Sequence, residues 1–171
     1  MIDRLIDLLA TSAKLFWPIA VVDEFEGAVV LRLGTFSRDL APGWHWIWPF
    51  AIDRVLTCWT CIQTVDLEPQ SLTTANGQAV VVRATVVYVI DDARTHLLKV
   101  ASAGGVIEDA ATGSVSDYIM GRTWEQLQAK DLAHEIGKEI RRKAKEFGVA
   151  VRGVYLKDFQ RCRSIRILGK Q

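Results

Sequence analysis

An alternating run of aromatic residues limits the folds that this chain can adopt. The run is Pro42-Gly43-Trp44-His45-Trp46-Ile47-Trp48-Pro49-Phe50. Alternate side chains of an extended strand share a face, so the run predicts one aromatic row: Trp44, Trp46, Trp48 and Phe50. Pro49 cannot donate to a strand ladder, which favours a short strand at a sheet edge. Such a row either packs inside the domain or lies at a membrane interface, where tryptophan is favoured.

The first residues predict an amphipathic helix over 2–17. At helical spacing its apolar side carries Ile2, Leu5, Ile6, Leu9, Ala13 and Phe16. Trp17 follows, and Pro18 ends the helix. The apolar run 15–22 is much shorter than the roughly 20 residues that cross a bilayer. This pattern leaves two interpretations open, a helix packed on its own domain and a helix lying in a membrane surface.

The chain then changes from strand patterns to helical patterns. Strands are predicted at 28–33, through the aromatic run, within 53–65 and at 79–90, with an Asn76-Gly77 turn before the last. Helices are predicted at 93–100, 106–120 and 131–147, and a capping box begins at Thr123. Gly148 is the expected stop of the third helix. A strand at 149–159 follows, with room for another at 165–168.

Charge is unevenly distributed along the chain. Residues 1–130 hold 10 Lys and Arg against 15 Asp and Glu, a net of −5, whereas residues 131–171 hold 11 against 5, a net of +6. Three basic side chains of the predicted helix 131–147 lie off its apolar stripe: Arg141, Arg142 and Lys145. They are candidate contacts with an acidic face of another subunit. No recognition motif accompanies them, so nucleic acid is not an expected partner.

The sequence offers little for catalysis. Cys58 and Cys61 have redox-motif spacing, but they lie in a strand pattern that turns the two sulfurs apart. The histidines and Cys162 show no metal-ligand spacing, and no nucleophile is spaced with a base. We therefore expect no catalytic residue, metal or cofactor. A thiol redox protein remains a distant alternative.

Five stretches in order resemble the stomatin/prohibitin/flotillin family, known as SPFH or band 7, and its stomatin branch most closely. They are the strand pair 22–34 with its Arg-x-Gly ending, the hairpin 42–53, the block from Leu72-Thr73-Thr74 to Tyr88, Gly121-Arg122-Thr123-Trp124-Glu125-Gln126-Leu127, and 147–158 with Leu156-Lys157-Asp158. The resemblance implies an α+β fold, the SPFH (PHB) domain. It consists of a mixed, curved β-sheet followed by helices and a C-terminal strand.

The same resemblance implies a membrane-associated oligomeric scaffold that organises a membrane patch or a partner membrane protein. The expected membrane-contact residues are Ile2, Leu5, Ile6, Leu9, Phe16, Trp17, Trp44, Trp46, Trp48 and Phe50. The expected partners are lipid, further copies in a ring or cage, and a membrane protease or channel as client, on the cytoplasmic side. A soluble adaptor module is the alternative.

The predicted organisation has four parts: a membrane-association helix at 1–18, a β-rich half at 19–95, an α/β half at 96–162 and a basic tail at 163–171. Family members usually continue into a long alanine- and glutamate-rich helix that joins subunits, and this sequence does not show one. We therefore expect subunits to meet through their oppositely charged faces.

Overall fold

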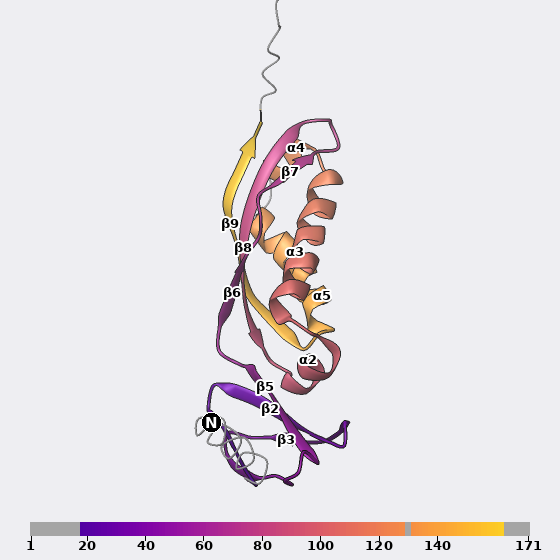
Figure 1. The fold of residues 1–171 in the computed structure, drawn as a ribbon. Coiled ribbons are helices and arrows are strands. Elements are labelled where there is room, and N and C mark those ends of the chain that lie inside the picture. Colours follow the sequence, from indigo (N-terminus) through magenta and orange to yellow (C-terminus); the bar gives the residue numbers. More distant parts are fainter. Residues whose placement is uncertain (1–17, 129–130, 163–171) are drawn as a thin grey trace, which may run out of the picture. The chain divides into compact units, whose positions relative to one another are not determined.

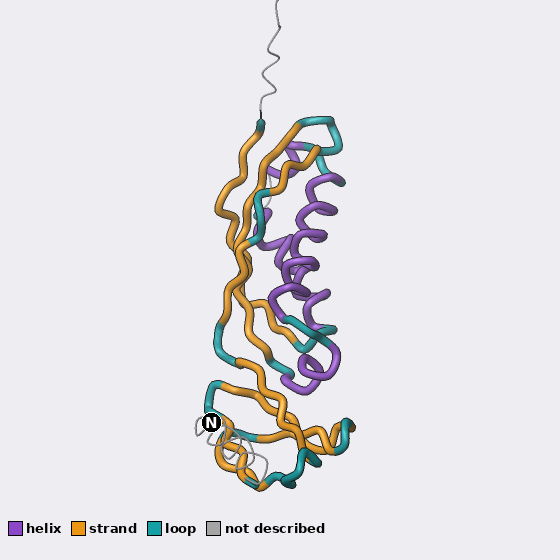
Figure 2. Tube along the Cα trace, viewed as in Figure 1, coloured by secondary structure: helices purple, strands orange, loops and turns teal. Residues whose placement is uncertain are grey.

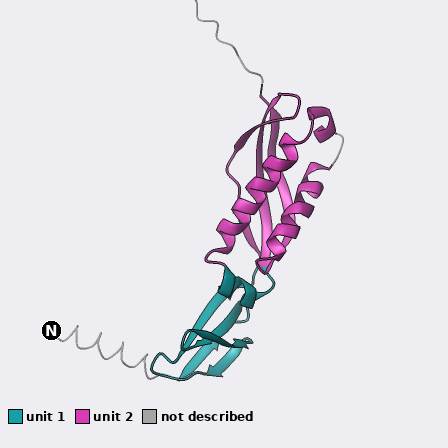
Figure 3. Ribbon diagram, turned by 90° about the vertical axis from the view of Figure 1, so that its right-hand side faces the viewer, with its two compact units in different colours: residues 1–61, 90–99 teal, residues 62–89, 100–171 magenta. Residues whose placement is uncertain are grey.

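The computed structural model describes residues 18–128 and 131–162. Contacts divide the chain into two compact units, residues 1–61 with 90–99 and residues 62–89 with 100–171 (Figure 3). The units are interleaved along the sequence, unlike the two consecutive halves predicted from it. The predicted helix 2–17 and the predicted strand 165–168 lie outside the described residues.

In its described residues, the first unit is built from two small sheets and one helix (Figure 1). The β1 strand (Ile19–Val22) pairs antiparallel with β4 (Gly43–Trp46). The second sheet has the order β3-β2-β5 and contains Thr35–Leu40, Glu26–Arg32 and Asp53–Trp59. The α2 helix (Ala93–Lys99) packs against β2 and β5.

The sheet β3-β2-β5 has two different faces. Gly27 faces α2, since a Cβ there would meet Ala93. The neighbouring positions on β2 belong to the opposite face, because side chains alternate along a strand. That face contributes to a core cluster made of Val22, Ala28, Val30, Leu40 and Val55. The cluster takes Val22 from β1, so the sheet β1-β4 lies over this face.

The second unit places helices against a sheet centred on β8 (Ala79–Ile90). The β6 strand (Gln63–Asp66) and β7 (Gln70–Thr73) pair antiparallel with β8, and β9 (Val149–Arg161) also pairs with it. The helices are α3 (Ala103–Met120), α4 (Trp124–Gln128) and α5 (Leu132–Lys145). Figure 2 shows these helices on one face of the strands.

In the second unit, buried side chains repeat with the strand period along β8 and with the helix period along α3 and α5. Every second residue of β8 from Val80 to Tyr88 is buried, which is the strand period. The helices bury one stripe each. The residues of α3 and α5 on these stripes are Ile107, Ala111, Val115, Ile119, Leu132, Ile136, Ile140 and Ala144.

Several local predictions are confirmed. Strand β8 has the predicted bounds, and the Asn76-Gly77 turn joins β7 to β8. Helix α5 lies within the predicted range 131–147, and the structure adds a cap, since Asp131 accepts the backbone N–H of His134. Gly148 has φ of 74° just beyond that helix, a conformation that glycine adopts at little cost. At Thr123 the Gln126 side chain accepts the backbone N–H at 3.1 Å, one half of the predicted capping box.

The α+β class and the C-terminal strand are likewise confirmed, although the described strands divide among three sheets. Strands β3 and β7 were missed. The sequence of β3, Thr-Phe-Ser-Arg-Asp-Leu, is mostly polar and exposed because β3 lies at a sheet edge. A polar edge strand lacks the hydrophobic alternation on which the prediction relied.

Candidate membrane-contact surface

The two-stranded sheet β1-β4 has one outward face made of large apolar side chains. In its antiparallel register Ile19 lies opposite Trp46 and Val21 opposite Trp44, and directly opposed residues share a face. All four are exposed, Ile19 by 37%, Val21 by 69%, Trp44 by 73% and Trp46 by 58%. We call these four residues the aromatic face.

The other side of the same sheet faces the interior. Val22 is buried in the core cluster, and Ala20 and His45 are half-buried. His45 is held through its Nε2, which lies 2.6 Å from the Ala41 carbonyl oxygen. Side chains of both strands therefore alternate between a buried and an exposed face, as in other sheets with one solvated side. Here, however, the exposed positions are apolar instead of polar. Contiguous apolar surface of this kind marks interaction sites, because water solvates it poorly.

Exposed aromatic residues continue past the end of β4, but the chain that carries them there is no longer a strand. The prediction of one extended row from Trp44 to Phe50 is wrong, because β4 ends at Trp46. The chain turns through residues 47–52, where Phe50 and Ala51 have φ of 63° and 59°, a region that residues other than glycine seldom occupy. Trp48 and Phe50 are nevertheless more than half exposed. We call residues 47–52 the aromatic turn.

A buried carboxylate holds the aromatic turn. Asp53 accepts hydrogen bonds from Arg32 at 2.8 Å to Oδ1 and 3.1 Å to Oδ2, and from the Trp48 backbone N–H at 3.0 Å. Its side chain is fully buried, whereas that of Arg32 is partly exposed. The hydrogen bonds from Arg32 hold the pKa of Asp53 below its usual value, against the opposite effect of burial. Asp53 is thus charged, and it fixes the backbone that carries Trp48.

A second turn lies beside the aromatic turn. The Leu33 backbone N–H donates to the Ile52 carbonyl oxygen at 2.8 Å. Leu33 stands at the turn between β2 and β3 with φ of 51° and is exposed. We call this end of the first unit, where Leu33 and the aromatic turn lie, the Leu33 end.

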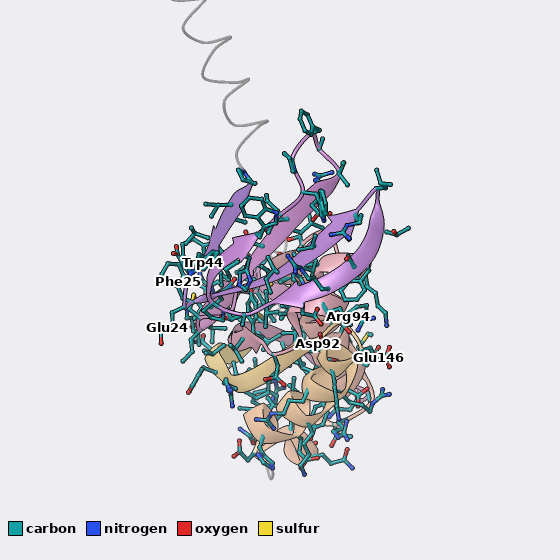
Figure 4. The ribbon with its side chains drawn as sticks, turned by 90° about the horizontal axis from the view of Figure 1, so that it is seen from below. Glu24, Phe25, Trp44, Asp92, Arg94 and Glu146 are labelled. Atoms are coloured by element: carbon teal, nitrogen blue, oxygen red, sulfur yellow. The ribbon has the colours of Figure 1, made fainter. Side chains whose placement is uncertain are left out.

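The opposite end of β2 carries another aromatic pair. The rings of Phe25 and Trp59 lie 5.8 Å apart. The turn before β2 holds the acidic residues Asp23 and Glu24, and β2 itself begins with Glu26. Figure 4 labels Glu24 and Phe25 of this turn together with Trp44. We call this end the Phe25 end.

The remaining predicted membrane-contact residues cannot be placed on this surface. Ile2, Leu5, Ile6, Leu9, Phe16 and Trp17 lie outside the described residues. Within the described part of the chain, none of the helices combines the length and apolarity needed to cross a bilayer. Sequence reasoning also missed Ile19, Val21 and Leu33. The first two could have been found from the alternation of Ile19-Ala20-Val21-Val22, had its pairing with the aromatic strand been known.

Comparison with known proteins agrees with the fold. Residues 20–166 match the SPFH domain / Band 7 family. The chain belongs to this family. It is also similar to Stomatin-4 of Caenorhabditis elegans, with 25% identity over 162 residues, which cover 92% of this chain and 57% of that relative. The chain therefore spans little more than half the length of the relative.

The basic residues predicted for subunit contact lie on α5 of this SPFH domain and are exposed. They differ in the hydrogen bonds and ion pairs that their side chains make within the chain. Arg141 donates through Nε to the Val151 carbonyl oxygen at 3.2 Å, and Arg142 forms an ion pair with Glu139. The side chain of Lys145 forms no hydrogen bond or ion pair with the described residues. Of the three side chains, that of Lys145 therefore has the fewest partners among the described residues.

The cysteines of the SPFH domain lack the environment of a redox site. Cys58, Cys61 and Cys162 are all free, and Cys58 is buried in β5. Burial raises the pKa of the Cys58 thiol, whereas reactive cysteines have a lowered one. The described residues also contain no group of His, Cys, Asp or Glu that could hold a metal ion.

Proposed function

We propose that this SPFH protein attaches to a membrane surface through its aromatic face and aromatic turn and forms a scaffold there, without catalysis of its own. The observation that carries the proposal is the bare outward side of the β1-β4 sheet. Four large apolar residues share it, and the opposite side of the same sheet is buried. Tryptophan is the residue most favoured at a lipid interface, since its ring is apolar and its N–H can remain hydrated.

The exposed area is large enough for reversible attachment. Full burial of a large apolar side chain is worth about 1.5–3 kcal/mol. The aromatic face, Trp48 and Phe50 are each between a third and three quarters exposed. Their transfer into a membrane interface would contribute on the order of 5–10 kcal/mol before ordering costs. One chain would then bind weakly, and several joined chains would bind firmly through effective concentration.

The segment at 1–17 is proposed as a second anchor. Its predicted apolar stripe, from Ile2 to Phe16, ends shortly before β1. A helix lying in the interface plane there would continue the surface that β1 and β4 present. Two weak anchors on one chain reinforce each other in the same way as two lipid chains do.

Self-assembly is the other half of the proposal. Arg141, Arg142 and Lys145 are the proposed contacts, meeting an acidic face of a neighbouring copy and closing into a ring or cage. Exposed ion pairs are weak, so charge would set the register while apolar contact provided affinity. The proposed clients are a membrane protease or channel on the cytoplasmic side.

Vesicle flotation tests the attachment. We expect the full chain to float with phospholipid vesicles, and the double substitution Trp44→Ser and Trp46→Ser to reduce the floated fraction several-fold. Tyr155→Ser is the matched control, because it removes an exposed aromatic side chain from β9. A chain without residues 1–17 should still float, although more weakly.

Three results would contradict this proposal. Failure of the full chain to float would favour the soluble adaptor. Equal losses from the Tyr155 control and the double substitution would show that the aromatic face is not special. If the double variant floats as well as the unsubstituted protein, and deletion of residues 1–17 abolishes floating, the whole anchor lies in that segment.

Sedimentation tests the assembly. Arg141→Glu with Lys145→Glu should lower the sedimentation coefficient of the detergent-solubilised protein, whereas Arg152→Glu, also on an exposed side chain, should not. Higher salt should act in the same direction, since the Debye length falls from about 8 Å at physiological ionic strength to about 3 Å at 1 M. A monomer under every condition would contradict the scaffold.

A further inference from the structure

The two ends of the first unit carry opposite charge. Strand β2 runs from Glu26, opposite Trp59, to Arg32, opposite Asp53. The Phe25 end therefore gathers the acidic residues Asp23, Glu24 and Glu26. The Leu33 end gathers Arg32, Arg38 and Arg54, together with the buried Asp53, and the exposed Asp39 follows Arg38 on β3. Both ends expose apolar side chains, so charge distinguishes them.

Two of the three arginines form no ion pair among the described residues. Arg32 is paired with Asp53. Among the described residues, no Asp or Glu forms an ion pair with Arg38 or Arg54, and both arginines are exposed. The Leu33 end thus carries more guanidinium groups than carboxylates, although the charge of Asp53 also acts on Arg38.

Arg38 is tied directly to the aromatic face. It lies on β3 opposite Val30, and its Nη2 donates to the Trp46 carbonyl oxygen. This bond uses one of the five N–H groups of a guanidinium and leaves the others free. Arg38 therefore holds its charge beside Trp46. Arg54 lies opposite Leu31, two residues from Leu33, on the other face of the sheet β3-β2-β5, which is the face that Gly27 turns toward α2.

We propose that the Leu33 end recognises the phosphate groups of anionic phospholipids and so sets the direction in which the aromatic face meets the membrane. Leu33, Trp46, Trp48 and Phe50 enter the headgroup region, Arg38 and Arg54 contact lipid phosphates, and the acidic Phe25 end points away. This inference rests on the proposed membrane attachment and adds the lipid class and the orientation.

The chemistry of the two ends requires this direction on an anionic surface. A guanidinium presents several N–H donors in a fixed plane that matches phosphate oxygens. An anionic leaflet attracts basic residues that lie within about a Debye length, roughly 8 Å, of its surface. The same field repels Asp23, Glu24 and Glu26. A neutral bilayer would give no such preference between the ends.

The test compares vesicles of pure phosphatidylcholine with vesicles containing about 30% phosphatidylserine. The full chain should bind the anionic vesicles more tightly, and raising the salt should remove the difference. Arg38→Gln and Arg54→Gln should each weaken binding to anionic vesicles about fivefold. Among the described residues the side chain of Arg54 forms no hydrogen bond with the aromatic face, so Arg54→Gln should leave binding to neutral vesicles unchanged. Arg38→Lys, which keeps the charge, should retain most of the affinity.

Arg152→Gln is the control for net charge, since Arg152 is exposed on β9. Orientation is tested by single substitutions on the aromatic face. Trp46→Ser should weaken binding to anionic vesicles more than Trp44→Ser, although Trp44 is the more exposed of the two. Circular dichroism of each variant checks that the fold is retained.

The inference fails if the full chain binds both kinds of vesicle equally, if Arg152→Gln costs as much as Arg54→Gln, or if Trp44→Ser is the more damaging substitution. Each of these results leaves the proposed attachment intact, because binding itself persists. Absence of binding to either kind of vesicle would instead contradict the attachment, and the inference with it.

Discussion

Neighbouring valines on β1 allow the two sides of the β1-β4 sheet to be tested with one chemical change. Val21 is 69% exposed on the aromatic face, and Val22 is 2% exposed in the core cluster. Valine to threonine keeps the shape and the β-branching and replaces one methyl group by a hydroxyl. Position on the sheet is then the main difference between Val21→Thr and Val22→Thr.

The two substitutions should affect different quantities. Val22→Thr should lower the free energy of unfolding, and Val21→Thr should weaken membrane binding. Val22→Thr buries a hydroxyl among apolar side chains, which should lower the free energy of unfolding by about 1–3 kcal/mol. Val21→Thr changes an exposed position and should alter it by less than about 0.5 kcal/mol. On vesicles, Val21→Thr loses the transfer of about one methyl group and leaves a hydroxyl in its place, which corresponds to roughly 1 kcal/mol or about fivefold in the partition coefficient.

Urea denaturation followed by circular dichroism measures the first quantity, and sedimentation with vesicles measures the second. Val22→Thr should leave vesicle binding of the folded protein unchanged. Val22→Ala serves as a second core variant, in case the hydroxyl finds a backbone acceptor. Equal effects of the two threonine substitutions on both measurements would refute the assignment of the two faces.

Two further predictions concern what supports the surface. A Cβ at Gly27 would lie 2.4 Å from the Cβ of Ala93, so Gly27→Ala should lower the unfolding free energy by about 1–3 kcal/mol. Adding Ala93→Gly should restore much of that stability. A double variant no more stable than Gly27→Ala would contradict this packing. The pKa of Asp53 is lowered from 3.8, so its stabilisation is complete above that value and is lost as the pH falls through the lower folded-state pKa. The fall in melting temperature between neutral pH and about pH 3 should thus be smaller in Asp53→Asn than in the unsubstituted protein. An equal fall would show that folding does not lower the pKa of Asp53.

The sequence by itself determined the elements whose signals are local. Strand β8 was predicted with its observed bounds because twelve consecutive residues favour a strand and an Asn-Gly turn precedes them. Helix α5 was predicted from its apolar stripe and the stop at Gly148. Five family stretches in order were enough to predict the SPFH fold, since each of them is contiguous in the chain.

Only the tertiary structure decided which side of the aromatic strand faces outward. Alternation shows that Trp44 and Trp46 share a face, but burial depends on the sheet that the opposite face covers. Pairing with β1 brings Ile19 and Val21 to that face from more than 20 residues away in sequence. Such pairing depends on strand register between distant segments, and local periodicity carries no information about register. For the same reason the sequence did not show that Arg38, from the missed strand β3, holds the carbonyl of Trp46.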